Sequence, residues 1–207
     1  AALAKTRGLD VLAVTDHDTI AGVDAAAAAG ARLGLRVIRG VELSAKEYPN
    51  FHILGYGFRP DAPALSSLCE KLRAGRDDRK YRILSLLQEK GISLSLEEVE
   101  ELAGGEVIAR PHFARALVRR GYVSSNREAF DRYLDSEEFR QRVGRFKADA
   151  RTCIEVIKAA GGWVSLAHPC QLQLPEEALD AMVRRLRGWG LDAIECDYPT
   201  YTPAERS

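Results

Sequence analysis

Apolar residues in this chain form short runs that alternate with longer amphipathic segments, a pattern typical of strands followed by helices. Each short run is bounded by glycine or polar residues and is too short for a core helix, so we predict strands at 10–15, 35–41, 50–58, 163–167 and 192–196. The segments between them predict helices at 20–33, 151–160 and 175–189, and residues 1–8 predict a helix at the start of the sequence. Repeated strand-then-helix units indicate parallel strands, either in a barrel or in an open doubly wound sheet.

The segment from residue 62 to residue 148 differs from the rest because it is charged and poor in strand signals. Amphipathic spacing predicts helices at 65–88, 111–120 and 125–134, and Ser95 to Glu98 predicts a capping box at the start of another helix. We therefore expect a discontinuous α/β core at 1–61 and 149–207 that is interrupted by a helical insertion at 62–148.

The charge and cysteine content narrow the possible partners. Thirty basic and thirty acidic residues cancel, which argues against a broad basic face for long DNA but permits a local pocket for one phosphate. The four cysteines lack any C-x-x-C pair, which predicts reduced, mostly buried thiols in a cytoplasmic protein; they are Cys69, Cys153, Cys170 and Cys196. Apolar runs stay far below the roughly 20 residues of a membrane span, so we expect no membrane partner.

Polar side chains of the metal-ligand type stand beside the predicted strands. His17, Glu42 and His168 each follow a strand, and the carboxyl ends of parallel strands meet at one rim of a barrel. His52 is near the start of its strand instead, so it reaches that rim only if the strand runs in the opposite direction or begins earlier.

Imidazole nitrogens together with a carboxylate suit Zn²⁺, Mn²⁺ or Fe²⁺ better than Mg²⁺ or Ca²⁺. Asp16 and Asp18 flank His17 and would orient its ring or anchor its loop. Taken one at a time, each histidine also fits a structural role, and the three carboxylates also fit helix capping. His112, at the start of a predicted helix, also fits a surface position.

Five segments in sequence order change the balance between these interpretations. They are DVLAVTDHDT at 10–19, GVELS at 40–44, FHILGY at 51–56, RPHFARAL at 110–117 and LAHP at 166–169. Together they resemble the signature segments of the PHP (polymerase and histidinol phosphatase) superfamily of metal-dependent phosphoesterases. RPHFARAL is most similar to the branch that contains nucleotide phosphatases and 5′-to-3′ exoribonucleases.

The resemblance implies a distorted (β/α)7 PHP barrel that holds up to three divalent metal ions. It implies that His17, Glu42, His52 and His168 are metal ligands, with Glu42 as the bridging carboxylate and Asp16 and Asp18 in supporting positions. It further implies hydrolysis of a phosphomonoester of a nucleotide or short RNA by metal-activated water.

The resemblance also implies that the insertion caps the site and that its RPH segment lies near the substrate phosphate. Arg110, His112 and, by a weaker match, Arg145 are the corresponding residues there. His112 would hydrogen-bond the phosphate or protonate the leaving oxygen, and the first role is favoured.

The superfamily's opening HxH strand and closing GSDxH segment have no counterpart here. We therefore expect a barrel that is truncated at both ends, with little activity in this chain alone. Alternatives are a histidinol-phosphatase-like enzyme for another small substrate, a non-catalytic structural PHP module, or a plain metal-binding or nucleotide-binding module. The sequence does not indicate an oligomeric state.

Overall fold

The structure, a computed structural model, describes residues 1–104 and 108–206, so residues 105–107 of the predicted insertion lie outside the described part. The chain forms two compact units. The first unit comprises Ala1–Arg73 together with Lys147–Ser207, and the second comprises Ala74–Phe146.

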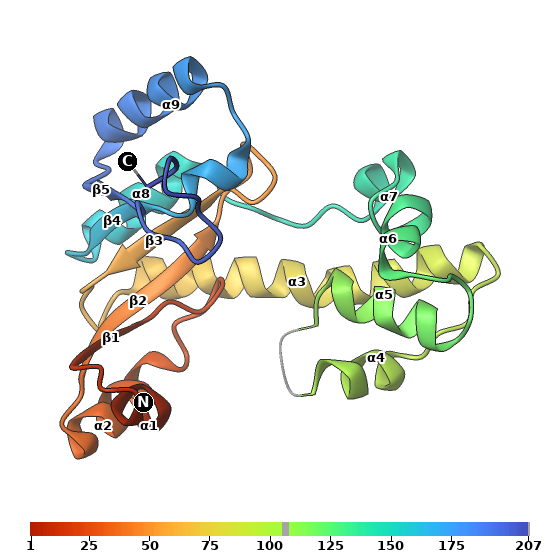
Figure 1. Ribbon diagram of the computed structural model, residues 1–207, viewed down its shortest axis with the longest axis horizontal. Helices are drawn as coiled ribbons and strands as arrows, with labels where there is room; N and C mark the ends of the chain where they lie inside the picture. Colours follow the sequence, from red (N-terminus) through yellow and green to blue (C-terminus); the bar gives the residue numbers. More distant parts are fainter. Residues whose placement is uncertain (105–107, 207) are drawn as a thin grey trace. The chain divides into compact units, whose positions relative to one another are not determined.

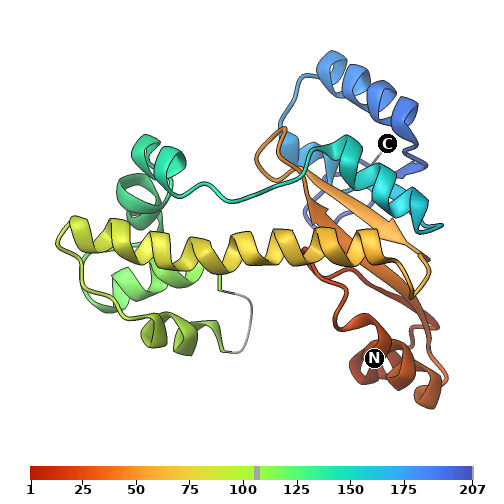
Figure 2. The ribbon, with the colours of Figure 1, turned by 180° about the vertical axis from the view of Figure 1, so that it is seen from behind.

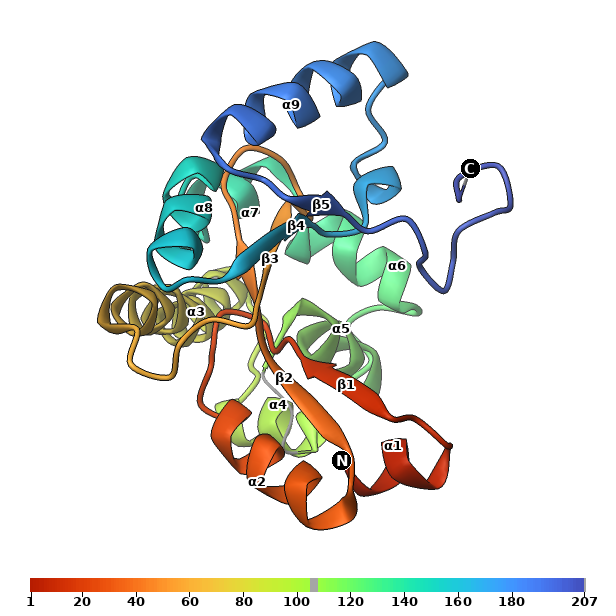
Figure 3. The same cartoon turned by 90° about the vertical axis from the view of Figure 1, so that its left-hand side faces the viewer.

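The first unit is built on one five-stranded mixed sheet in the order β1-β2-β3-β4-β5 (Figure 3). The strands are β1 Val11–Val14, β2 Arg36–Ser44, β3 His52–Tyr56, β4 Trp163–Leu166 and β5 Ala193–Ile194. β1 is parallel to β2 and β4 is parallel to β5, but β3 is antiparallel to both β2 and β4. The expectation of an all-parallel sheet is therefore wrong at β3. The physical reason is that only the short segment 45–51 joins β2 to β3, whereas a parallel crossover needs a dozen or more residues.

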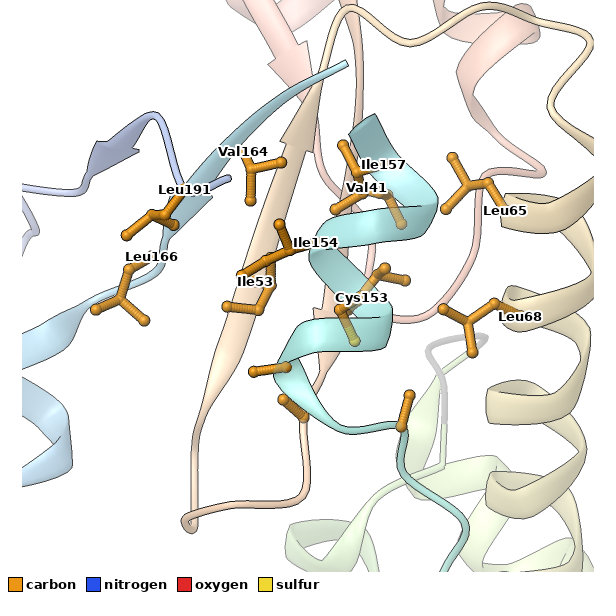
Figure 4. Close-up of a cluster of buried hydrophobic side chains, with 14 of the residues drawn as sticks. Val41, Ile53, Leu65, Leu68, Cys153, Ile154, Ile157, Val164, Leu166 and Leu191 are labelled. Atoms are coloured by element: carbon orange, nitrogen blue, oxygen red, sulfur yellow. The ribbon is translucent and has the colours of Figure 1, made fainter. Parts of the chain in front are cut away.

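Side chains alternate across β2 and β3, and one face of these strands forms the core of the first unit. Val41, Leu43 and Ile53 are fully buried there. Figure 4 shows Val41 and Ile53 beside Ile154 and Ile157 of α8 (Ala150–Ala159). A Cβ at Gly55 would lie 3.0 Å from the Ile157 side chain, so any larger residue there requires Ile157 to shift. The other helical elements of this unit are α1 Ala2–Thr6, α2 Val23–Leu33, α9 Glu176–Trp189 and a 3₁₀ turn, Pro169–Leu172.

One helix, α3 (Pro63–Glu89), runs without interruption through the division between the two units (Figure 1). Leu65, Leu68 and Leu72 are buried in the core of the first unit, whereas Ile83 and Leu87 belong to a separate core in the second. The compact units therefore divide within α3, at residues 73 and 74, rather than before it, because the first turns of α3 help to cover the sheet.

The second unit is helical in its described part. The elements that follow α3 are α4 Leu96–Ala103, α5 Arg110–Arg119, α6 Asn126–Ala129, a π-helical turn Phe130–Leu134 and α7 Glu137–Arg142. Figure 2 shows the C-terminal half of α3 beside α4 and α5. Its core contains the buried side chains of Val99, Phe113, Leu117 and Phe139. The capping box predicted for α4 is confirmed: the Ser95 hydroxyl accepts from the Glu98 backbone N–H, and the Glu98 carboxylate accepts from that of Ser95.

Two helix predictions need correction. The helix predicted at 20–33 begins at Val23 after Gly22, so the Asp18 carboxylate does not cap it. The sequence interpretation also missed α7, whose N-cap is the side chain of Ser136.

All four cysteines are free thiols, and Cys69 and Cys153 are buried. Within the described residues, no helix has both the length and the apolar character needed to cross a bilayer.

Candidate metal centre

The candidate site lies on the face of the sheet opposite the α8 core. His52, Leu54 and Tyr56 are alternate residues of β3, and they line a cavity of about 350 Å³ together with Glu42 of β2. The same alternation that buries Val41 and Leu43 on one face therefore turns Glu42 to the other. His17 and His168 reach this cavity from the segments that follow β1 and β4.

The direction of β3 explains how His52 joins the other histidines. Because β3 is antiparallel to its neighbours, its first residue lies at the rim where β1, β2 and β4 end. Ser44 near the end of β2 pairs with His52, and His17 forms an isolated parallel bridge with Glu42. Four residues far apart in sequence thus meet at one rim.

The Glu42 carboxylate is at the centre of this cluster. Its Oε1 lies 2.8 Å from Nδ1 of His52 and 3.2 Å from Nε2 of His168, and its Oε2 lies 3.6 Å from Nδ1 of His17. The two facing nitrogens of His52 and His168 are 3.1 Å apart. Both carboxylate oxygens therefore face imidazole nitrogen, on different sides.

These distances suit a metal ligand set. In a tetrahedral site with bonds of about 2.0–2.1 Å, neighbouring ligand atoms lie about 3.3 Å apart, close to the separations observed around Glu42. His17, Glu42 and His52 can each offer one ligand atom within 4.8 Å of the others. Nitrogen donors with one carboxylate fit Zn²⁺, Mn²⁺ or Fe²⁺.

The cluster also sets the ionisation of its members. Burial opposes the charged form of Glu42, but hydrogen bonds from His168 and His52 and the nearby His17 lower its pKa to about 2. Burial likewise opposes the charged form of His168, but its hydrogen bond to Glu42 outweighs this and raises its pKa above the usual value. Glu42 is therefore held as a carboxylate.

His168 is held by its backbone as well as by its ring. Its φ of 29° is strained for a residue with a side chain, and its N–H donates to Oε2 of Glu195 at 2.8 Å. Its Nδ1 is buried and has no hydrogen-bond partner among the described residues. Asp18, beside His17, and Asn50, on the cavity wall, also have positive φ. Three of the four non-glycine residues with positive φ in the described part of the chain therefore lie at or beside this site.

Asp18 anchors the loop that carries His17. It is 1% exposed, and its two carboxylate oxygens accept from the backbone N–H of Ser44 at 2.7 Å and the Ser44 hydroxyl at 2.9 Å. Asp16 is exposed, and it contributes its backbone carbonyl, which accepts from the Glu42 N–H at 3.1 Å. These bonds fix the loop after β1 to the end of β2.

The remaining predicted site residues belong to the second unit. Arg110 and Arg145 line a cavity there of about 190 Å³. Arg110 donates to Asp135 at 2.7 Å and lies over the ring of Phe130. His112 is buried rather than on the surface, and its Nδ1 accepts from the Ala109 N–H at 3.0 Å.

The sequence interpretation missed Glu195 and Tyr198, which also line the cavity of the first unit. The Tyr198 ring packs edge-on against that of His168, with centroids 5.5 Å apart. Glu195 directly follows β5, so the rule that selected His17 and His168 by their position after a strand could also have selected Glu195.

Comparison with known proteins finds no matching family model, but it finds close relatives. The chain is 37% identical to a 5′-3′ exoribonuclease of Haemophilus influenzae, over 93% of this chain and 70% of that protein. It is 33% identical to a phosphoribosyl 1,2-cyclic phosphate 1,2-diphosphodiesterase of Eggerthella lenta, over 99% and 78%. It is 32% identical to a 3′,5′-nucleoside bisphosphate phosphatase of Chromobacterium violaceum, over 93% and 68%.

The solved structures support the same relationship. An amidohydrolase from Chromobacterium violaceum, with bound sulfate and no metal, matches with a TM-score of 0.81 at 30% identity, over 98% of this chain and 72% of that one. The sequence relatives, this structural match and the cluster of histidines around Glu42 all indicate the same family. The chain belongs to the PHP-type phosphoesterase family.

Proposed function

We propose that this protein is a metal-dependent phosphoesterase that hydrolyses a phosphate ester of a nucleotide. Its substrate would be the 3′-phosphate of a 3′,5′-bisphosphonucleotide or the 5′ end of a short RNA. The named activities of the Haemophilus influenzae and Chromobacterium violaceum relatives support this proposal. The single observation that carries it is the Glu42 carboxylate facing three imidazole nitrogens.

His17, Glu42, His52 and His168 would hold the divalent metal. When bound, such an ion lowers the pKa of a coordinated water and neutralises charge on the phosphate oxygens. Glu42 suits a bridging role because its Oε1 and Oε2 face different histidines. Glu195 and Asp18 are positioning residues, since they fix the backbone around His168 and His17 through hydrogen bonds.

Arg110 and Arg145 would bind the substrate phosphate, because a guanidinium offers paired donors that match two phosphate oxygens. Asp135 and the Phe130 ring hold Arg110 in place before substrate arrives. This lowers the conformational entropy lost on binding.

His112 would donate a hydrogen bond to the phosphate rather than protonate the leaving oxygen. Its Nδ1 already accepts a backbone N–H, so the ring proton is on Nε2 and the ring is neutral. A cationic ring would place a second N–H against that of Ala109. The tautomer therefore favours the binding role.

We also propose that the five-stranded sheet is part of a distorted (β/α)7 barrel and that residues 62–148 are its helical insertion. The resemblance of the motifs supports both, and the match in fold to the Chromobacterium violaceum structure supports the first. The free cysteines suit a cytoplasmic location.

The test is phosphate release from adenosine 3′,5′-bisphosphate by purified protein whose metal content is measured by elemental analysis. We expect release that EDTA abolishes and that Mn²⁺, Zn²⁺ or Fe²⁺ restores. Phosphoribosyl 1,2-cyclic phosphate and histidinol phosphate serve as comparison substrates. Faster turnover of either one would replace the nucleotide assignment, and undiminished release in EDTA would overturn the metal mechanism.

A further inference from the structure

The cavity around Glu42 contains polar side chains that are not among the proposed metal ligands. Its described lining includes the carboxamides of Asn50 and Gln171 and the phenol of Tyr198, and none of its described lining residues is a lysine or an arginine. Its volume of about 350 Å³ is in the range of about 300–1,000 Å³ that is usual for small-molecule sites. The charge of a phosphate would therefore be balanced by bound metal, which leaves the neutral groups available to an uncharged part of the substrate.

Strand pairing brings Asn50 and Gln171 to the same rim. Asn50 directly precedes Phe51 and β3, and Gln171 follows β4 in the 3₁₀ turn. β3 and β4 are antiparallel, and the Ala167 N–H donates to the His52 carbonyl at 3.2 Å. The start of β3 and the end of β4 therefore lie side by side, and both carboxamides are at the rim that carries the histidines.

The backbone of both residues is fixed, whereas their carboxamides are uncommitted. Asn50 has a φ of 56°, a left-handed conformation that asparagine tolerates better than most residues, and the Gln171 N–H donates to the His168 carbonyl at 3.0 Å. In the described part of the chain, neither carboxamide forms a hydrogen bond with another protein group. Each can therefore bind a ligand without breaking a hydrogen bond within the protein.

Tyr198 adds an aromatic ring beside Gln171. Its ring packs against those of His168 and Tyr201, with centroids 5.5 and 5.4 Å away. The Tyr201 hydroxyl accepts from the N–H of Cys170, the residue before Gln171, at 3.0 Å. Carboxamides that bond to polar groups and aromatic rings that stack on bases are the groups with which proteins bind nucleosides.

We propose that Asn50 and Gln171 recognise the nucleoside of the substrate through hydrogen bonds from their carboxamides, with Tyr198 as an aromatic contact. A carboxamide offers two N–H donors and one acceptor oxygen, which suits a neutral hydroxyl or the edge of a base. The inference rests on the proposed function for the choice of a nucleoside. It assigns residues that select the leaving alcohol, as distinct from those that bind phosphate or metal.

The test compares two substrates that share a phosphate ester but differ in the alcohol. Adenosine 3′,5′-bisphosphate carries a nucleoside, whereas phenyl phosphate has no hydrogen-bonding group outside its phosphate. Gln171→Met and Asn50→Gly should each lower kcat/KM for the bisphosphate about fivefold, the effect of losing one neutral hydrogen bond. Both variants should keep the wild-type kcat/KM for phenyl phosphate and the wild-type metal content, measured by elemental analysis.

Each variant has a matched control. Gln173→Gly is the control for Asn50→Gly, because Gln173 is also exposed, has a φ of 52° and does not line the cavity. Glycine adopts positive φ without strain, so both substitutions remove a carboxamide and keep the backbone. Gln88→Met is the control for Gln171→Met, because Gln88 is exposed on α3 and does not line the cavity. Thermal melting shows that each variant is folded.

Adenosine binding to the Mn²⁺-loaded protein, measured by isothermal titration calorimetry, separates this inference from the proposed function because it requires no hydrolysis. We expect Asn50→Gly and Gln171→Met each to weaken it about fivefold. Normal phosphate release with wild-type kcat/KM and adenosine affinity in both folded variants would leave the proposed function intact and reject this inference. Equal losses with phenyl phosphate would also reject it, since they would place the defect at the metal centre. Weaker adenosine binding in both variants of a protein that releases no phosphate would support the inference and overturn the proposed function.

Discussion

The two cavities of this protein differ in the charge of the side chains that line them. In the first unit, the carboxylate of Glu42 is at the centre of a cavity that is lined by side chains of β2 and β3 and of the segments that follow β1, β2, β4 and β5. In the second unit, side chains of α3, α5 and the segment after α7 surround the guanidinium of Arg79. One site is suited to cations that act as Lewis acids, and the other is suited to anions.

The difference shows that a chain with a net charge of zero can still contain two cavities of different local charge. Thirty basic and thirty acidic residues balance over the chain, yet the described lining of the second cavity is cationic and that of the first contains acidic and imidazole groups. Composition alone disfavours a broad basic face, but it does not locate a pocket. We infer that the first unit performs the chemistry and that the second recognises phosphate.

The largest expected effect separates the two sites. Glu42→Gln keeps the shape of the side chain but removes the charge that three histidines face, so bound metal and phosphate release should both be lost. Loss of a residue that only hydrogen-bonds a metal ligand lowers activity by up to about 100-fold, and we expect phosphate release to fall by more than this because Glu42 would be a ligand itself. Adenosine 5′-monophosphate binding in EDTA should be unchanged.

Glu155→Gln is the control for this variant, because Glu155 is an exposed partner of Arg151 on α8. Metal content by elemental analysis and phosphate release by a colorimetric assay are the measurements. Retention of both in Glu42→Gln would contradict the central role assigned to this carboxylate.

The next effect concerns the scaffold of the first unit. Asp18→Ala leaves the buried N–H and hydroxyl of Ser44 without their acceptor, and two bonds to a carboxylate are worth about 3 kcal/mol in total. We expect a loss of that size in the free energy of unfolding, measured with urea, and weaker metal binding. Asp24→Ala, which removes an exposed partner of Arg39, should cost less than about 0.5 kcal/mol; a similar cost in both variants would refute the anchoring role.

A smaller effect tests recognition in the second unit. Arg110→Gln should lower kcat/KM for a bisphosphonucleotide about tenfold, because it removes a phosphate contact, and it should leave metal content unchanged, because Arg110 belongs to the second unit. Arg140→Gln is a matched control, since Arg140 also contacts Asp135 but does not line the cavity. If both variants lose activity equally, the effect arises from Asp135 and not from phosphate binding.

The smallest effect should leave both sites untouched. Ser95→Ala removes the hydroxyl that caps α4, which should cost about 1 kcal/mol of unfolding free energy. Chemical denaturation measures the loss, and Ser95→Thr, which keeps a capping hydroxyl, should recover most of it. A change in metal content or in monophosphate affinity would show that the two sites depend on helix stability more than their geometry indicates.

The sequence determined the features that depend on neighbouring residues. The capping box at Ser95 follows from local hydrogen bonding, and α8 and α9 begin within one residue of their predicted starts because proline and a capping carboxylate act locally. The motifs were also sufficient to select His17, Glu42, His52 and His168, whose roles as metal ligands stay predictions.

Only the tertiary structure decided which of these residues meet. β3 is antiparallel to its neighbours, and this direction places His52 at the same rim as His17 and His168. Asp18 looked like a helix cap, but its carboxylate binds Ser44 of β2, a partner 26 positions away. In the sequence, Arg79 and Lys80 are two of the many charges of the helix predicted at 65–88, but in the structure they line a cavity together with Arg110 of α5. The physical reason is common to all three: hydrophobic periodicity fixes which face of an element is buried, but long-range packing chooses what that face and its opposite meet.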